Sequence, residues 1–426
     1  MNTTEMEKDD LTQNVNAIGR KARAAGMALA LVDTDAKNRA LHAIAHAIIG
    51  ASDAIVAANK KDVAAGEKNG LSKALLDRLT LTPERVKAMA EGVQEIAHLA
   101  DPTGEIMREW TRPNGMKIKQ IRVPLGVIGI IYESRPNVTA EAGALCLKSG
   151  NAVILRGGSE AVNSNQLLVD IISKALGAAG LPADAIQFLP PGDRRSITAL
   201  GQLNGLVDLI IARGSEEMIK SVRANASVPV LGHGKGVCHV YIDKFADMDK
   251  ALKIAVNAKV QRPGVCNAME TLIIHEYMMW DMLPKLAGEY LRAGVEMRGD
   301  DRVRGLVSQA KEATDEDWDT EYHDLILSIK IVDTIQEAIE HINRHGSGHT
   351  ESIITEDKKN AEMFQKAVDS SCVMVNASTR LHDGSVFGFG SEIGISTQKL
   401  HARGTMGLRE LTTTKYLVEG TGQIRE

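Results

Sequence analysis

Hydrophobic residues recur at helical spacing through the first hundred residues of the chain. In the first segment they follow each other at steps of three and four, at Val15, Ile18, Ala22, Ala25 and Leu29. After a polar break over residues 33–38 the pattern returns at Leu41, Ile44, Ala45 and Ile48. Thr82 and Pro83 are typical of an N-cap and first helical position, and we expect that helix to run towards Leu99. This part of the chain predicts an alanine-rich helical layer that serves packing.

Residues 106–123 change to an alternation of polar and apolar positions. Asn114 and Gly115 lie between the two alternating arms, and this pair is typical of a two-residue hairpin turn. We therefore predict a β-hairpin that interrupts the helical layer and protrudes from it. From the sequence alone, the hairpin can lie on its own domain or reach a second subunit.

From Val127 onward, short apolar runs alternate with helical stretches, which predicts βαβ units and a parallel, doubly wound sheet. The expected strands are 127–131, 152–155, 186–189 and 207–211, and the expected helices are 139–148, 163–176, 195–200 and 216–225. Ligands of such sheets bind at the carboxyl ends of the strands. The loops there are 132–137, 156–160, 190–194 and 212–216, and three of these four contain glycine. This indicates a nucleotide site, although GxGxxG is absent and the Gly232-His-Gly-Lys-Gly236 loop is a weak substitute.

A second α/β segment follows the first. Its expected strands are 237–242, 271–274, 325–332, 352–355 and 372–375, and its expected helices are 248–260, 280–293, 335–343 and 358–369. Residues 411–418 are predicted to form a final strand.

Composition narrows the class of protein. With 44% hydrophobic and 25% charged residues and a net charge of −5, the chain is typical of a globular protein and not of one that binds nucleic acid or a membrane surface. The four cysteines, Cys146, Cys238, Cys266 and Cys372, lie too far apart in sequence for a disulfide framework or a CxxC metal site. The first ten residues are polar and acidic, unlike a signal peptide, so we expect a cytoplasmic location.

Cys266 is the first candidate for chemistry. It lies in a turn with Pro263 and Gly264, directly before the apolar run 271–274. A thiol at the tip of such a turn can meet a substrate, and Asn267 offers an amide beside it. The alternative is that Cys266 is a small buried hydrophobic residue.

The order of these segments resembles the aldehyde dehydrogenase superfamily. Residues 332–353 are similar to the signature of its γ-glutamyl phosphate reductase family, as are residues 132–137, 155–160 and 261–266. The resemblance extends from about Ala17 to Val418. It implies an α/β fold of two doubly wound domains: a cofactor-binding domain (1–105 and 124–233) and a catalytic domain with a nucleophilic cysteine (234–385). It also implies an oligomerisation element made of the hairpin and the terminal strand (106–123 and 405–426).

The resemblance also implies roles for individual residues. Cys266 falls at the nucleophile position and Asn137 at the oxyanion-hole position, although Asn137 can also be a helix N-cap. Glu321 corresponds loosely to the residue that holds the nicotinamide ribose, and Phe389, in the stretch 387–390, would line the nicotinamide side unless it lies in a simple core turn. The adenosine ribose and pyrophosphate positions fall on Arg156, Gly157, Gly158, Ser159, Glu160, Gly214 and Ser215.

Arg156 stands where the superfamily usually has a lysine. A guanidinium can hold a 2′-phosphate bidentately, so the resemblance favours NADP(H) over NAD(H), the alternative being a solvated strand end. Arg135 and Arg262 are candidates for binding the substrate phosphate or carboxylate. His345 and His349 are further candidates, or histidines satisfied by backbone carbonyls. We expect no metal site, because this histidine pair lacks a third ligand and its glycines favour a loop.

The implied reaction is NADPH-dependent reduction of L-glutamyl 5-phosphate to L-glutamate 5-semialdehyde, in proline biosynthesis, through a thioester on Cys266. Leu231 stands where hydrolytic aldehyde dehydrogenases have a water-activating glutamate, and His233 is the only nearby candidate base, the alternative being a simple loop residue. The implied partners are the small-molecule substrate, further copies of the chain and glutamate 5-kinase. Two alternatives stay open: an ordinary hydrolytic aldehyde dehydrogenase, and a silent relative that binds nucleotide and senses redox state through Cys266.

Overall fold

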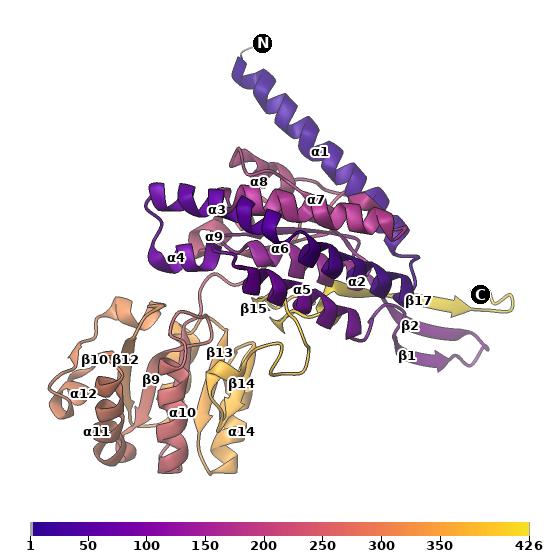
Figure 1. Cartoon of the computed structure of the whole chain (residues 1–426). Coiled ribbons are helices and arrows are strands. Elements are labelled where there is room, and N and C mark those ends of the chain that lie inside the picture. The colour runs from indigo at the N-terminus through magenta and orange to yellow at the C-terminus, as the bar shows by residue number, and fades with distance from the viewer. Residues whose placement is uncertain (1–2, 426) are drawn as a thin grey trace. The chain divides into compact units, whose positions relative to one another are not determined.

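A computed structural model describes residues 3–425 and divides the chain into two compact units (Figure 1). The first unit holds the described residues up to Gly232, with Gly388–Gly394 and the described residues from Met406 onward. The second unit holds His233–Phe387 and Ile395–Thr405.

The predicted helical layer forms in the first unit. Its helices are α1 (Thr3–Leu29), α2 (Thr34–Gly50), α3 (Ser52–Lys68), α4 (Lys73–Leu79) and α5 (Pro83–His98). The predicted break over residues 33–38 is wrong: only Asp33 stays outside the helix, and its side chain caps α2 by accepting from the Ala36 N–H at 2.7 Å. Thr82 caps α5 as predicted. Over the described residues, no single helix is long and apolar enough to cross a membrane. Taken together, α2 and α3 have the length and composition of a membrane span, but a bend of 68° separates them.

The first unit also contains the predicted doubly wound parallel sheet, in the order β5-β4-β3-β6-β7 over the described chain. Its strands are β3 (Val127–Tyr132), β4 (Ala152–Arg156), β5 (Ile186–Phe188), β6 (Leu209–Arg213) and the unpredicted β7 (Val230–Leu231). The connecting helices are α6 (Pro136–Lys148), α7 (Val162–Ala178), α8 (Arg195–Gly201) and α9 (Glu216–Asn225). Because the chain proceeds outward from β3 to β5 and then returns to β6, the loops after β3 and β6 flank a topological switch point.

The hairpin forms from β1 (Ile106–Thr111) and β2 (Lys117–Pro124), but its predicted two-residue turn is wrong. The Gly115 N–H donates to the Arg112 carbonyl at 2.9 Å, so the turn comprises Arg112–Gly115. Pro113 suits the second position of such a turn, and Gly115 takes the left-handed conformation at φ 88°. The terminal strand β17 (Thr412–Glu419) pairs antiparallel with β2 along its whole length, giving the sheet β1-β2-β17 (Figure 1).

The second unit is built on a parallel sheet with the order β11-β10-β12-β9-β8-β13-β14 over the described chain. Its strands are β8 (Cys238–Ile242), β9 (Met269–His275), β10 (Glu296–Gly299), β11 (Lys311–Glu312), β12 (Ile326–Val332), β13 (Thr350–Ile354) and β14 (Cys372–Val375). Its helices are α10 (Met248–Val260), α11 (Glu276–Arg292), α12 (Asp301–Leu306), α13 (Ile335–His345) and α14 (Lys358–Ala367). The sequence did not predict β10, β11 or α12, which are short and carry many charged residues.

The adjacency of β9, β8 and β13 brings candidate residues from three segments together. Parallel strands start at the same edge of a sheet, so residues that precede these three strands come together there. Cys266 lies three residues before β9, and His349 lies directly before β13. We call this edge of the seven-stranded sheet the amino edge, and the opposite one the carboxyl edge.

Candidate active site

Cys266 lies in the turn between α10 and β9. The Ala268 N–H closes this turn by donating to the Val265 carbonyl at 3.0 Å, and the Cys266 side chain is half-buried. Burial raises the pKa of the Cys146 and Cys238 thiols, and it raises the pKa of Cys372 to about 11. These three thiols are therefore held protonated near neutral pH and are poor nucleophiles.

Two histidines and a second cysteine surround the Cys266 turn. The Cys266 Sγ and one ring nitrogen each of His233 and His349 all lie within 4.8 Å of one another. Cys238, the first residue of β8, places its Sγ 3.2 Å from the Cys266 carbonyl oxygen and 3.7 Å from His349 Nδ1. The amino ends of three neighbouring strands thus converge on the candidate nucleophile.

The Gly232–Gly236 loop supports the Cys266 turn within the second unit. A Cβ atom on Gly236 would lie 2.0 Å from the Cys266 carbonyl oxygen, so only glycine fits there. Lys235 Nζ donates to the Asp319 carbonyl at 2.7 Å, which fixes the middle of the loop. The sequence indicated that this loop is a weak substitute for a phosphate-binding glycine motif. In the structure, Gly236 allows the backbone of the loop to pass directly against Cys266.

His349 is fully buried and uncharged. Its Nδ1 lies 2.7 Å from the Thr350 hydroxyl, which in turn lies 2.8 Å from His382 Nδ1. Burial, followed by the neighbouring rings of His233 and His382, holds the pKa of His349 well below its usual range. Its Nε2 has no hydrogen-bond partner among the described residues. A neutral ring at this depth cannot attract the substrate as a cation.

Arg380 is a residue that the sequence did not single out. Its guanidinium donates to the Asn267 side-chain oxygen and, at 2.9 Å, to Gln261 Oε1, on both sides of the cysteine in sequence. Burial and then Arg262 lower the pKa of Arg380, while Cys266 raises it, because a negative charge on that sulfur would attract the cation. The Asn267 amide that the sequence offered as a donor is engaged, because it donates to the His382 carbonyl at 3.0 Å.

The remaining predicted substrate residues lie in different places. Arg262 is exposed in the Cys266 turn, close enough to Arg380 to influence its charge. His345 is the last residue of α13; it pairs with Asp319 Oδ1 at 3.0 Å and contacts the ring of His341, outside the Cys266 cluster. Arg135 is the N-cap residue of α6, in the first unit.

Glu321 lies near the buried charges of the second unit. Burial raises the pKa of Glu270 to about 8 against the opposing effect of Lys259, which lies 2.5 Å away, and Glu321 adds a further upward contribution. Glu321 also contributes to the raised pKa of Cys238. Its Oε1 is buried without a hydrogen-bond partner in the part of the chain that the structure describes. A buried acceptor of this kind suits a hydroxyl donor from a ligand.

In the first unit, the predicted adenosine residues form one group at the end of β4. Arg156 is only 8% exposed, so the alternative of a solvated strand end is wrong. Its Nη1 donates to the Gly157 carbonyl at 3.1 Å, and its Nε lacks a partner within residues 3–425. A Cβ atom on Gly157 would meet the Asn165 side chain at 2.1 Å, and Glu160 accepts from the Ser134 hydroxyl at 2.8 Å. Gly158 and Ser159 lie between these residues, in the backbone that leads into a short 3-10 helix.

The switch point of the first sheet lies at the start of α9. Ser215 caps that helix, and its N–H donates to the Glu133 carboxylate, in the loop after β3, at 2.9 Å. A Cβ atom on Gly214 would lie 2.5 Å from the same carboxylate. A carboxylate therefore lies where a helix N-terminus favours an anion, and a pyrophosphate there would compete with it.

For Asn137 and Phe389, the sequence left a purely structural role open beside the functional one. Asn137 is not a helix N-cap, because α6 begins at Pro136 with Arg135 as the N-cap residue; the Asn137 amide donates to Glu141 Oε1 at 3.1 Å. Phe389 is 46% exposed between Gly388 and Gly390, which both adopt positive φ, so it does not lie in a core turn.

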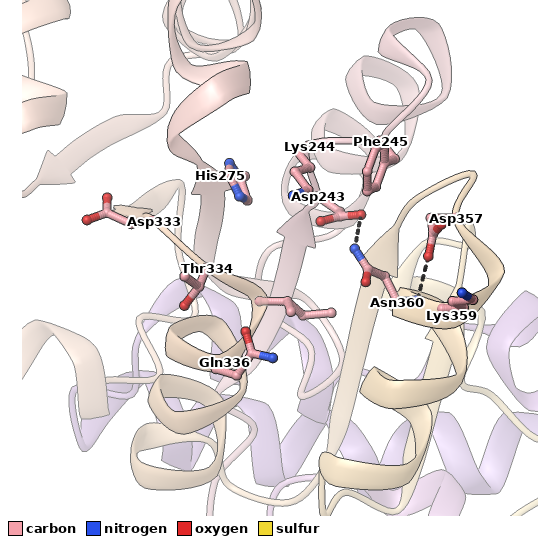
Figure 2. Close-up of a pocket in the computed structure, with 11 residues that line it drawn as sticks. Asp243, Lys244, Phe245, His275, Asp333, Thr334, Gln336, Asp357, Lys359 and Asn360 are labelled. Atoms are coloured by element: carbon pink, nitrogen blue, oxygen red, sulfur yellow. Dashed lines mark hydrogen bonds between the residues drawn. The ribbon is translucent and has the colours of Figure 1, made fainter.

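The second unit has a pocket of about 280 Å³ at the carboxyl edge of its sheet (Figure 2). Its lining includes five charged side chains, and several of its polar groups form hydrogen bonds at the ends of strands and helices. Asp243 accepts from Asn360 Nδ2 at 2.9 Å, and Asp357 caps α14 through the Asn360 N–H at 2.8 Å (Figure 2). His275 accepts from the Tyr277 N–H at 3.2 Å. No cysteine lines the pocket, and Asp243, Asp357 and His275 already have partners within the second unit.

Comparisons with known proteins identify the family of the chain. A sequence profile of the aldehyde dehydrogenase family matches residues 4–324 and 307–417. The chain therefore belongs to the aldehyde dehydrogenase family and is an oxidoreductase of that type.

Among its relatives, the gamma-glutamyl phosphate reductase of Thermoanaerobacter pseudethanolicus is 54% identical over 412 residues, covering 97% of this chain and 100% of that protein. The protein of the same name from Thermobifida fusca is 53% identical over 416 residues, covering 98% and 100%. The crystal structure of gamma-glutamyl phosphate reductase from Thermotoga maritima is 45% identical with a TM-score of 0.95, covering 97% of this chain and 100% of that one. The family resemblance and the fold class inferred from the sequence are confirmed.

Proposed function

We propose that this enzyme reduces L-glutamyl 5-phosphate to L-glutamate 5-semialdehyde and phosphate with NADPH, as a step of proline biosynthesis. The observation that carries the proposal is the Cys266 turn: a half-buried thiol beside the Arg380 cation, while the other three cysteines hold raised pKa values. The name shared by full-length relatives supports the substrate.

The reaction would proceed through a covalent thioester. The Cys266 thiolate attacks the acyl carbon, and inorganic phosphate leaves with the electron pair of the broken carbon–oxygen bond. Reduction of the thioester by one hydride and collapse of the resulting hemithioacetal release the aldehyde and return the thiolate. Asn137 would supply an amide to the developing oxyanion, and Arg135, Arg262, His345 and His349 remain candidates for holding the substrate.

Each unit contains residues whose chemistry suits part of a nicotinamide cofactor. Arg156 has a buried Nε without a partner among the described residues, which suits a 2′-phosphate and hence NADP(H). Gly157, Gly158, Ser159 and Glu160 would hold the adenosine ribose, Gly214 and Ser215 the pyrophosphate, and Glu321 and Phe389 the nicotinamide end. The bound cofactor supplies the hydride.

Leu231 separates this proposal from a hydrolytic aldehyde dehydrogenase. It is a fully buried strand residue of β7 and cannot accept a proton from water. A well-placed general base contributes about 10²–10⁴-fold, so its absence leaves the thioester for hydride or phosphate.

Phosphate dependence in the oxidative direction tests the proposed function. Oxidation of the semialdehyde with NADP⁺ should require phosphate or arsenate, and in phosphate it should release essentially no free glutamate. Equal rates without either anion, with accumulation of glutamate, would replace the reductase by the hydrolytic enzyme. No turnover under any condition would favour the silent redox sensor.

We further propose that the β1-β2-β17 sheet joins copies of the chain. All six residues of β1 are exposed, and an uncovered strand edge invites pairing. Deleting Arg112–Met116 should shift the sedimenting species towards monomer; a monomeric wild-type protein at micromolar concentration would contradict the idea.

We make two further proposals, one about a partner protein and one about the location of the enzyme. Glutamate 5-kinase is a candidate partner because an acyl phosphate is labile, and co-sedimentation of the two proteins tests this. A cytoplasmic location agrees with four cysteines that form no disulfide in the described chain, and cell fractionation tests it.

A further inference from the structure

Three side chains at the amino edge form a set of ligand atoms that the proposed reaction does not require as a set. We define the His233–Cys266–His349 cluster as the Cys266 Sγ with one ring nitrogen of each histidine, all within 4.8 Å of one another. Two imidazoles and one thiolate are ligands that Zn²⁺ favours. We propose that this cluster is a binding site for Zn²⁺, and that the bound ion blocks the enzyme reversibly by occupying its nucleophile.

Each of the two histidines has a polar group beside its Nδ1. His233 Nδ1 lies 2.8 Å from the Ile395 carbonyl, which can only accept, so in the neutral ring Nδ1 carries the proton and Nε2 carries the lone pair. His349 Nδ1 lies 2.7 Å from the Thr350 hydroxyl, and its buried Nε2 has no hydrogen-bond partner in the described chain. A polar partner behind each ring is the usual support of a metal-binding histidine.

The dimensions are compatible with a tetrahedral ion. Zinc bonds of about 2.0–2.3 Å separate neighbouring ligand atoms by roughly 3.3–3.7 Å. From separations of up to 4.8 Å, closure by an ångström or so is enough, and His233 and Cys266 are only partly buried. The fourth position would remain for water, as in zinc sites with three protein ligands.

Binding would change the state of the thiol. One Cys266 proton leaves to the solvent as the sulfur–zinc bond forms, and no electrons are transferred. The sulfur lone pair is then held by the metal, so it cannot attack an acyl carbon or an alkylating reagent. Metal binding itself does not depend on the proposed reaction and can be measured without substrate.

The ligand set explains why the sequence predicted no metal. The pair His345 and His349 lacked a third ligand, and His345 pairs with Asp319 instead. The cluster draws on three segments that only the strand order β9-β8-β13 and the loop before β8 bring together.

Calorimetric titration of the reduced, chelator-stripped full-length enzyme with Zn²⁺ tests the site. We expect one ion per chain, and Co²⁺ in its place should give the absorption of a thiolate–cobalt bond. His233→Ala and Cys266→Ser should each weaken binding by about 10–100-fold or more, and Cys266→Ser should abolish the thiolate band. Zn²⁺ should also slow iodoacetamide labelling of Cys266, and a chelator should restore it.

Matched controls separate this site from others. Cys238→Ser, which alters the thiol next to His349, and His345→Ala should keep both stoichiometry and affinity. His349 is fully buried, so a variant there can fail to fold; the partly exposed His233 carries the test instead. Absence of stoichiometric binding would overturn the proposal, as would binding that survives both Cys266→Ser and His233→Ala. Loss of the thiolate band in Cys238→Ser, with its retention in Cys266→Ser, would also overturn it.

Discussion

The amino and carboxyl edges of the seven-stranded sheet use similar side chains in different ways. At the amino edge, the partly buried Cys266 lies beside two histidines and the Arg380 cation, and His349 retains a buried nitrogen without a partner in the described chain. At the carboxyl edge, Asp243, Asp357 and His275 line a pocket (Figure 2). Asp243 accepts from the Thr355 hydroxyl, Asp357 from the Asn360 N–H and His275 from the Tyr277 N–H, so all three have partners in the chain.

This difference qualifies the rule that parallel sheets bind ligands at the carboxyl ends of their strands. The cofactor residues that we propose for the first sheet would follow the rule, because Arg156 ends β4 and Ser215 lies two residues after β6. In the second sheet, the candidate nucleophile lies before β9, at the other edge. Unsatisfied polar groups identify this site better than strand polarity or the presence of a pocket.

The largest effect is expected from removal of the amino-edge nucleophile. Cys266→Ala should lower phosphate-dependent NADP⁺ reduction by at least about three orders of magnitude, because no thioester can form. NADPH affinity, measured by fluorescence titration, should change only a few-fold. Cys372→Ala, at the amino end of β14, is the matched control and should cost only about 1–2 kcal/mol of stability. A Cys266→Ala enzyme within tenfold of wild type would remove the thioester mechanism.

A smaller effect concerns pH and the buried His341 beside this edge. Burial, then the neighbouring His239 and His345, lowers the pKa of His341 to about 2, against about 6.5 in the unfolded chain. Below about pH 6.5 the unfolded state therefore binds more protons than the folded state. The contribution of the neutral, buried His341 to the free energy of unfolding is present above that pH and is lost as the pH falls. At about pH 5.5 the loss should be on the order of 1 kcal/mol relative to about pH 7.5.

His341→Gln tests that prediction, because it should remove this part of the acid dependence. Urea unfolding can be followed by the fluorescence of Trp318, whose ring lies 5.3 Å from His341, with Trp110 and Trp280 replaced by phenylalanine. An unchanged difference between the two pH values would show that His341 does not contribute.

The sequence predicts some parts of this comparison well. Apolar runs revealed β3, β4 and β9, and the glycine turn identified Cys266 as a candidate. It predicts other parts poorly for a physical reason: His233, Cys266, His349 and Arg380 are separated by tens of residues, and only strand order joins the first three. Short charged strands such as Glu296–Gly299 lack the apolar pattern that would reveal them.

The smallest effect is expected at the carboxyl edge. Asp357 lines the pocket and caps α14 by accepting from the Asn360 N–H at 2.8 Å. Asp357→Ala should therefore cost about 0.5–2 kcal/mol of stability, while Asp357→Asn keeps the acceptor and should cost much less. Neither variant should change kcat or KM by more than about twofold, because the pocket lies at the edge opposite the nucleophile. If Asp357→Asn kept its stability but raised KM tenfold, the carboxylate would be binding substrate, and the assignment of catalysis to the amino edge alone would be wrong.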